Sequence, residues 1–366
     1  MNNREEQKST DIKLSLSDEF SSFLRKNNLS LIMTTNPGAV ITLGVTEHGL
    51  KLCHKPVMGA FAIACSHEKI SISHMRGITV FKKVGFTPLL DPNSNTDYSD
   101  YYTPLLTFHT GTCMVHELHA VPSGLLSVNT NFSTIDLIDG QYNFNPIWKP
   151  SFISKIIPED RCHLNGMAVK DKKIKFVSCF GPFDEAGGWR NKEDFHGQII
   201  SVETGLPVAE NLCLPHSPRI HGTNLYYCEA GLGTLVKTPL SDLTQKEIVC
   251  ELTGFTRGLD FFENYAVVGL SKSRGSNSLP TLPINAKCAE LNAAINLVNL
   301  ETNELLGAIK FIEGIEEILD VKIIKNTSSV GIGWGYYAME DTHLSESQVG
   351  AFWIADKKSK ALNSKN

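Results

Sequence analysis

Six times along the chain, a short group of residues, most often polar, precedes a turn and a run of strand-forming residues. The groups recur at intervals of roughly 40 to 60 residues and begin near Met58, His116, His163, His216, Phe255 and Glu316. Self-similarity at this period is typical of a β-propeller, in which each blade is one four-stranded sheet and the blades surround an axis. We therefore predict an all-β fold, a six-bladed β-propeller.

The segments upstream of the first unit predict how the ring closes. They read as strands at 31–35, 39–43 and 50–53, and in closed propellers such strands complete the last blade and remove its open edge. We predict that closure here. Ser17 is the expected N-cap of a short helix near 18–27, with acidic residues in its first turn and basic residues in its last. The expected domain organisation is a flexible arm over 1–17, a single propeller domain over 18–355 and a flexible tail over 356–366.

The polar groups of the repeating units predict a site. The innermost strand of every blade lines the axis, so residues at equivalent positions of different blades should meet there. Gathering imidazoles, carboxylates and guanidiniums is costly unless they pair or hold a ligand. The candidate catalytic residues are Glu117, His119, His163 and His216. The candidate ligand-binding residues are Asn165, Arg219, Arg257, Glu316, Asp320, Trp189 and Arg190.

Two interpretations of the histidines stay open. Residues i and i+2 of a strand share a face, so Glu117 and His119 are expected to point together and His116 away. His119, His163 and His216 would then be candidate ligands of one divalent transition metal, because imidazole suits such ions. In the alternative interpretation, each histidine hydrogen-bonds the backbone between blades.

Two interpretations are also open for the arginines. A guanidinium stays charged, so Arg219 and Arg257 need a carboxylate or phosphate nearby. They either clamp an anionic group of a substrate or pair internally with Glu316, Glu317 or Asp320.

Three long segments interrupt the strand pattern, at 86–107, 182–196 and 271–288. Loops of this length are frequently functional. The second carries Trp189 and Arg190 after two glycines, which predicts either an aromatic lid or a side chain packed back onto a blade.

Composition excludes several classes of function. A net charge of -5 leaves no basic footprint for nucleic acid. No apolar run approaches the ~18–20 residues of a membrane span, and the first 13 residues lack the apolar region of a signal peptide. Nine cysteines without a C-x-x-C pair indicate reduced thiols. We expect a cytoplasmic protein with no nucleic-acid or membrane partner.

The motifs also carry a family resemblance, through stretches at 29–35, 58–62, 116–129, 150–166, 187–190, 215–219, 254–259, 268–272 and 315–321. In them the sequence resembles an uncharacterised bacterial family of conserved hypothetical proteins, which implies a six-bladed propeller and no assigned reaction. It is more distantly similar to gluconolactonase- and strictosidine-synthase-like propellers, some of which hold a divalent metal on the axis. Their acidic and asparagine ligand set is not recognisable here, so a calcium-dependent lactonase activity is not implied.

Two hypotheses for function follow. In the first, the chain is an enzyme that binds a small anionic or polar ligand, and a metal-assisted hydrolase or lyase fits because imidazole and carboxylate pairs suit proton transfer. In the second, it is a non-catalytic interaction propeller, an accessory in a biosynthetic or modification complex, with a protein partner on loops 86–107 and 271–288. Propellers host both roles. The recurrence of polar residues at one end of several units favours the first.

Overall fold

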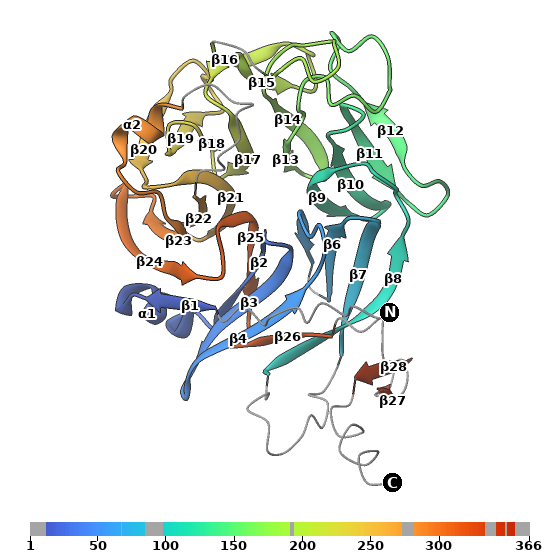
Figure 1. Ribbon diagram of the computed structural model, residues 1–366, viewed down its shortest axis with the longest axis vertical. Helices are drawn as coiled ribbons and strands as arrows, with labels where there is room; N and C mark the ends of the chain where they lie inside the picture. Colours follow the sequence, from blue (N-terminus) through green and yellow to red (C-terminus); the bar gives the residue numbers. More distant parts are fainter. Residues whose placement is uncertain are drawn as a thin grey trace, which may run out of the picture.

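A computed structural model describes residues 12–66, 68–84, 98–190, 194–272, 282–333, 342–347 and 350–355. Six sheets stand around a common axis as the blades of a propeller (Figure 1). The predicted all-β, six-bladed fold is confirmed. Within the described ranges, no helix combines the length and the apolarity needed to cross a membrane.

Each blade is an antiparallel sheet whose first strand is innermost. The first blade contains β5 (Ile63–Cys65), β6 (Lys69–His74), β7 (Gly77–Val84) and β8 (Asp100–Phe108). The second contains β9 (Val115–Val121), β10 (Gly124–Asn129), β11 (Thr134–Ile138) and β12 (Asn145–Trp148). The third contains β13 (Gly166–Lys170), β14 (Lys173–Cys179), β15 (Gly197–Ser201) and β16 (Pro207–Leu212). The fourth contains β17 (Pro215–His221), β18 (Asn224–Glu229), β19 (Thr234–Pro239) and β20 (Glu247–Glu251). The fifth contains β21 (Phe255–Phe262), β22 (Tyr265–Ser271), β23 (Ala293–Asn299) and β24 (Glu304–Glu313).

The sixth blade joins the two ends of the chain. Its inner strand is β25 (Glu317–Lys325), and β2 (Leu29–Asn36), β3 (Ala39–Thr46) and β4 (Gly49–Pro56) complete it. The predicted closure by N-terminal strands is confirmed. Past β25, β26 (Val330–Ile332) pairs in parallel with β8 of the first blade. A separate hairpin follows, made of β27 (Thr342–Ser347) and β28 (Gly350–Ala355).

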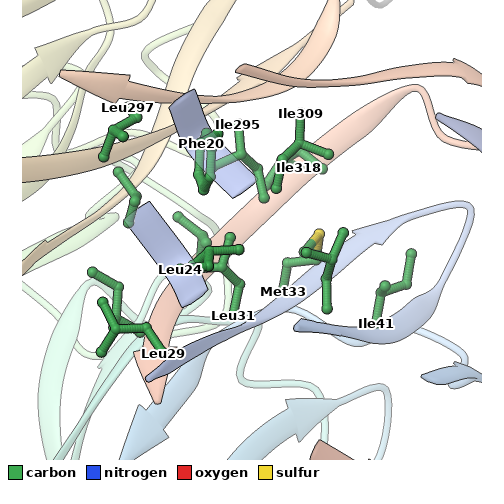
Figure 2. Close-up of a cluster of buried hydrophobic side chains, with 14 of the residues drawn as sticks. Phe20, Leu24, Leu29, Leu31, Met33, Ile41, Ile295, Leu297, Ile309 and Ile318 are labelled. Atoms are coloured by element: carbon green, nitrogen blue, oxygen red, sulfur yellow. The ribbon is translucent and has the colours of Figure 1, made fainter. Parts of the chain in front are cut away.

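The N-terminal segment covers the outer edge of the fifth blade. Lys13–Leu16, expected within the flexible arm, instead form β1, which pairs with β24. The predicted helix is α1 (Asp18–Lys26), and Ser17 caps it by accepting a hydrogen bond from the Phe20 amide at 3.3 Å. Phe20 and Leu24 are fully buried and pack against aliphatic side chains of the fifth and sixth blades (Figure 2). Burial of this apolar face therefore fastens the helix to the closing blade.

The predicted long loops are partly regular. Residues 100–108, expected in the first loop, form β8, and α2 (Pro283–Lys287) lies in the third. Residues 85–97, 191–193 and 273–281 of these loops lie outside the described residues, as does the expected tail over 356–366.

Hydroxyl side chains fasten successive blades at one face of the ring. We call this the start face, because the innermost strands begin there, and the opposite face the end face. The hydroxyls lie at or near the start-face ends of second strands and donate to carbonyls at the start of the next inner strand: Thr34 to Phe61, Ser73 to Val115, Thr130 to Leu164 and Ser271 to Ile318. These bonds fix the backbone beside the side chains described next.

Candidate functional site

A bulge determines which histidine of the second blade enters the site. In β9, Glu117 pairs with Val128 and Val115 pairs with Asn129, so His116 is an extra residue in the strand. A bulge changes the direction of a side chain from that given by strict alternation. The expected alternation does place Glu117 and His119 beside the same two cations, but the histidine that joins His163 is His116.

Rings and one guanidinium from several blades meet at the start face. We call this set the start-face cluster: Phe61, His116, His163, Phe180, Trp189, His216 and Arg257. The ring centroids of His116 and His163 lie 4.9 Å apart, and Phe61 stacks on His116 at 4.2 Å. Phe180 lies between His163 at 4.4 Å and His216 at 5.3 Å. The structure therefore brings together the predicted residues His163, His216, Trp189 and Arg257.

Strained backbone fixes the protonation site of two of these imidazoles. Met114 and Leu214 adopt left-handed conformations, with φ of 51° and 55°, which are uncommon for such residues. Each turns its carbonyl back to the histidine two residues later, 2.9 Å from Nδ1 of His116 and of His216. A carbonyl oxygen only accepts, so Nδ1 carries the proton in both rings and Nε2 is left as an acceptor.

His163 obtains the same tautomer from a carboxylate. Its Nδ1 lies 3.1 Å and 3.2 Å from the two oxygens of Asp160, which forms an imidazole–carboxylate dyad. Asp160 also accepts hydrogen bonds from the Trp189 indole at 3.1 Å and from Arg190 at 3.3 Å. The loop carrying Trp189 and Arg190 is therefore packed back onto the site, where it holds the acidic partner of the dyad.

Burial keeps the other two imidazoles neutral. His116 and His216 are only 9% and 8% exposed, and burial lowers the pKa of each well below its usual value. The neighbouring His163 and Arg257 lower both pKa values further. Arg257 lies over the Phe61 ring with its guanidinium carbon 4.3 Å from the centroid. The start-face cluster thus combines neutral hydrogen-bond acceptors with one positive charge.

Asn165 contributes a buried donor. Its Oδ1 accepts from the Ser178 hydroxyl at 2.6 Å, whereas its Nδ2 has no hydrogen-bond partner among the described residues. The side chain is 3% exposed. Buried amide groups without partners are rare and costly, so this one is a candidate contact for a ligand oxygen.

A second polar group, the axial ion cluster, is internally neutralised: Glu117, Arg219, Asp320 and Lys322. Arg219 donates to both oxygens of Glu117 at 2.8 Å, and Lys322 lies 3.0 Å from Asp320 and 3.6 Å from Glu117. Arg219 therefore pairs internally: Glu117 accepts its hydrogen bonds, and the expected Asp320 belongs to the same cluster and attracts it electrostatically. Two carboxylates balance two cations, so this cluster stabilises the contacts between inner strands and leaves little charge for a ligand.

The remaining predicted site residues lie elsewhere. His119 lies beside Arg219 and Lys322. Partial burial of its ring lowers its pKa to about 4, and the charges of these two cations contribute to the decrease. Glu316 is exposed, and its amide donates to the Asn36 carbonyl. Neither residue contacts the start-face cluster through any bond of the described residues.

The residues present do not fit the predicted metal. Within the described parts of the chain, no three His, Cys, Asp or Glu side chains are gathered so that they could hold a metal ion. His119 lies beside two cations, and Arg257 lies close to His116 and His216. Positive charge at both places opposes a divalent cation. A metal site made of His119, His163 and His216 is therefore not supported.

A six-bladed β-propeller with a buried histidine cluster at one face of the ring is the class of protein that this fold and site define. Within that class, the chain belongs to the family described as Domain of unknown function (DUF4915), which matches residues 18–332. The expected resemblance to an uncharacterised propeller family is confirmed. No curated protein matches the chain.

Solved structures share the architecture at low identity. A chain of the nidogen–laminin complex aligns with a TM-score of 0.51 and 8% identity, over 81% of this chain and 99% of that chain. A gluconolactonase from Xanthomonas campestris aligns with a TM-score of 0.46 and 9% identity, over 89% of this chain and 92% of that chain. At these identities the likeness concerns the fold alone.

Sequence reasoning missed Asp160, Phe61, Phe180 and the role of His116. Asp160 had a signal, because it lies three residues before His163 in a run of polar residues, Glu159–His163. The phenylalanines had none, since an aromatic residue near a strand usually belongs to the core.

Proposed function

We propose that this protein is an enzyme that carries out proton-transfer chemistry on a small hydroxylated carboxylic acid bound in the start-face cluster. One observation carries the proposal. Three buried imidazoles each use Nδ1 on a fixed acceptor, and none of the three Nε2 atoms bonds to a described residue. A site with three imidazole acceptors of the same tautomer beside a guanidinium suits a ligand that has hydroxyl donors and one negative charge.

The residues take distinct roles in this proposal. Arg257 holds the carboxylate, and Asn165 Nδ2 donates to a ligand oxygen. His116 and His216, kept neutral, accept hydrogen bonds from ligand hydroxyls. His163 is the general base, because Asp160 stabilises the imidazolium that forms when Nε2 takes a proton.

The reaction class is a hydrolase or a lyase. As a lyase, His163 takes the proton from the carbon beside the carboxylate, the C–O bond of the next carbon breaks, and the imidazolium returns the proton so that water leaves. As a hydrolase acting on an ester of the acid, His163 takes a proton from water, the water oxygen bonds to the acyl carbon, and the imidazolium protonates the departing alkoxide. No other proton donor is needed, since one histidine acts first as base and then as acid. The nine cysteines, all free thiols, support placing this reaction in a reducing cytoplasm.

Nitrogen-15 NMR of histidine-labelled protein tests the observation directly. We expect His116 and His216 to show protonated Nδ1 and unprotonated Nε2 at pH 7, and His163 to carry a proton on Nδ1. Asp160→Asn, whose amide can donate as well as accept, should disturb the tautomer of His163 and leave that of His216 unchanged. Protonated Nε2 atoms of His116 and His216 in the wild-type protein would contradict the proposal.

Deuterium exchange tests the chemistry without knowledge of the product. Hydroxy acids of four to six carbons, such as malate and gluconate, are incubated with the protein in D₂O. Binding by calorimetry and wash-in of deuterium beside the carboxylate by NMR are then measured. Arg257→Gln should abolish binding, and His163→Gln should abolish wash-in while binding persists. His48→Gln, an exposed histidine, is the matched control. Binding that survives in Arg257→Gln would refute the assigned anion site.

The interaction-propeller hypothesis has less support. The loops expected to form its binding face are described only in part, and within them Leu105 and Leu106 of the first loop are the exposed large apolar side chains among the described residues. The start-face cluster, in contrast, presents three imidazole Nε2 atoms that bond to no described residue, and Nδ2 of Asn165, two residues after His163, has no hydrogen-bond partner among the described residues.

A further inference from the structure

Three methionine side chains are exposed on the start face. Met58 lies in the link between the sixth and first blades, Met75 in the turn between β6 and β7, and Met114 in the segment before β9. Their exposed fractions are 70%, 54% and 49%. Exposed large apolar side chains that gather at one place mark a binding surface, and methionine adapts its shape to apolar ligands.

The three methionines, which we call the methionine rim, are continuous with the start-face cluster. The Met75 amide donates to the Met58 carbonyl at 3.2 Å, and Met58 lies three residues before Phe61, whose ring stacks on His116. The Met114 carbonyl is the acceptor that fixes His116 Nδ1. Each methionine of the rim is therefore connected, through its backbone or its neighbours in sequence, to the ring pair of Phe61 and His116. Arg257 lies over the Phe61 ring.

The other exposed apolar side chains have a different distribution. Apart from Ile156, those among the described residues lie on the fourth strands of blades or in turns at the end face: Leu50, Leu105, Leu106, Tyr142, Ile147, Leu206, Ile248, Leu305 and Ile312. Among the described residues, the methionine rim is the exposed apolar group that lies beside the imidazole Nε2 atoms of the start-face cluster.

The area of the methionine rim indicates what kind of ligand covers it. A stable protein interface buries roughly 800 Å² on each partner, formed by about 20 to 30 residues. Three side chains cannot supply that area, and they lie beside a charged and hydrogen-bonding cluster. A ligand with an apolar segment beside its polar head fits both features.

We propose that the substrate is an amphiphilic hydroxy acid, whose carboxylate and hydroxyl bind the start-face cluster and whose alkyl chain lies on the methionine rim. This inference rests on the proposed function and narrows it from small hydroxy acids in general to those that carry an alkyl chain.

The test is a chain-length series. Binding of 3-hydroxybutyrate, 3-hydroxyhexanoate and 3-hydroxyoctanoate is measured by calorimetry, below the concentrations at which they aggregate. In the wild-type protein, we expect affinity to rise about two- to fourfold for each added methylene, as apolar surface leaves water. In the double variant Met58→Gln, Met75→Gln, which leaves the Met114 segment beside His116 unchanged, the affinity for 3-hydroxybutyrate should persist and the dependence on length should weaken strongly.

The control is Leu206→Gln with Leu305→Gln, which removes two exposed leucines far from the rim and should keep the full dependence. Equal affinity for all three acids would overturn this inference. In that case, loss of binding of the three acids in Arg257→Gln would still support the proposed function. Failure of all three acids to bind would overturn both. A dimer in solution that the double variant dissociates would also overturn the inference, because a second copy would then cover the rim.

Discussion

His116 and His216 show how burial of single residues sets the charge of the site. Burial lowers both pKa values in the folded protein, whereas the unfolded chain titrates near 6.5. Below that pH the unfolded state binds more protons, so stability that is fully present above pH 6.5 is lost as the pH falls. We expect the free energy of unfolding to drop by about 2 kcal/mol for each residue between pH 7 and pH 5.

Urea unfolding at the two pH values measures this drop. The double variant His116→Asn, His216→Asn should lose most of the pH dependence that these residues cause, and His48→Asn should keep it. Equal slopes in the wild type and the double variant would mean that the two imidazoles are not held neutral by burial.

Glu117 provides a second test at the level of single residues. Glu117→Gln removes the carboxylate bonded to Arg219 and leaves Arg219 and Lys322 with Asp320 and the weaker attraction of Asp260. Removing one partner of a buried ion pair costs about 3–5 kcal/mol, because the remaining charge is not compensated. Glu68→Gln, which removes the carboxylate paired with Lys82 in a more exposed pair, should cost less than about 1 kcal/mol. Chemical denaturation of both variants makes the comparison, and similar losses would contradict the assigned role of the axial ion cluster.

Among the structural elements, the inner strands share one irregularity. Pairing shifts occur beside His116 in β9, after His216 in β17 and at Arg257 in β21. Each shift lies near the start of its strand and changes the direction of a side chain in the start-face cluster. Strict alternation, which serves well for the rest of these strands, therefore fails at the residues that form the site.

The bonds between blades can be tested with one hydroxyl. Ser73 accepts from the Ala62 amide at 2.8 Å and donates to the Val115 carbonyl at 3.1 Å, both buried. Ser73→Ala leaves these two groups without a partner and should cost about 1–3 kcal/mol. Ser66→Ala, at an exposed serine, should be nearly neutral. The urea midpoints of the two variants measure the difference in stability. An unchanged midpoint for Ser73→Ala would show that the Ser73 hydrogen bonds add little to the contact between blades.

On the scale of the whole molecule, closure depends on β25. It pairs with all of β2, from Leu29 opposite Lys325 to Asn36 opposite Glu317. A protein truncated before residue 317 lacks the inner strand of its sixth blade and exposes the edge of β2. We expect it to lose cooperative unfolding by circular dichroism.

Removal of residues 1–16 is the matched truncation. It deletes β1, which adds only four residues to the outer edge of the fifth blade, so this variant should stay folded with a lower midpoint. A cooperative transition in the variant without β25 would show that five blades suffice, contrary to the closure argument.

Much of the fold could be predicted because it depends on local chemistry. The repeating turn and strand signals marked the blades, and Ser17 with its acidic successors marked the start of α1. The candidate site was predicted less well. His163, His216, Trp189 and Arg257 do meet, whereas Glu117 and Arg219 neutralise each other and His119 lies outside the group.

The sequence by itself determined the blade count, the closure by N-terminal strands and the supply of imidazoles and guanidiniums near the axis. These depend on periodicity and residue type, which are properties of short segments. Only the tertiary structure decided which side chains share one site. Bulges, left-handed residues such as Met114 and Leu214, and the pairing of Glu117 with Arg219 all depend on contacts between blades that lie far apart in the chain.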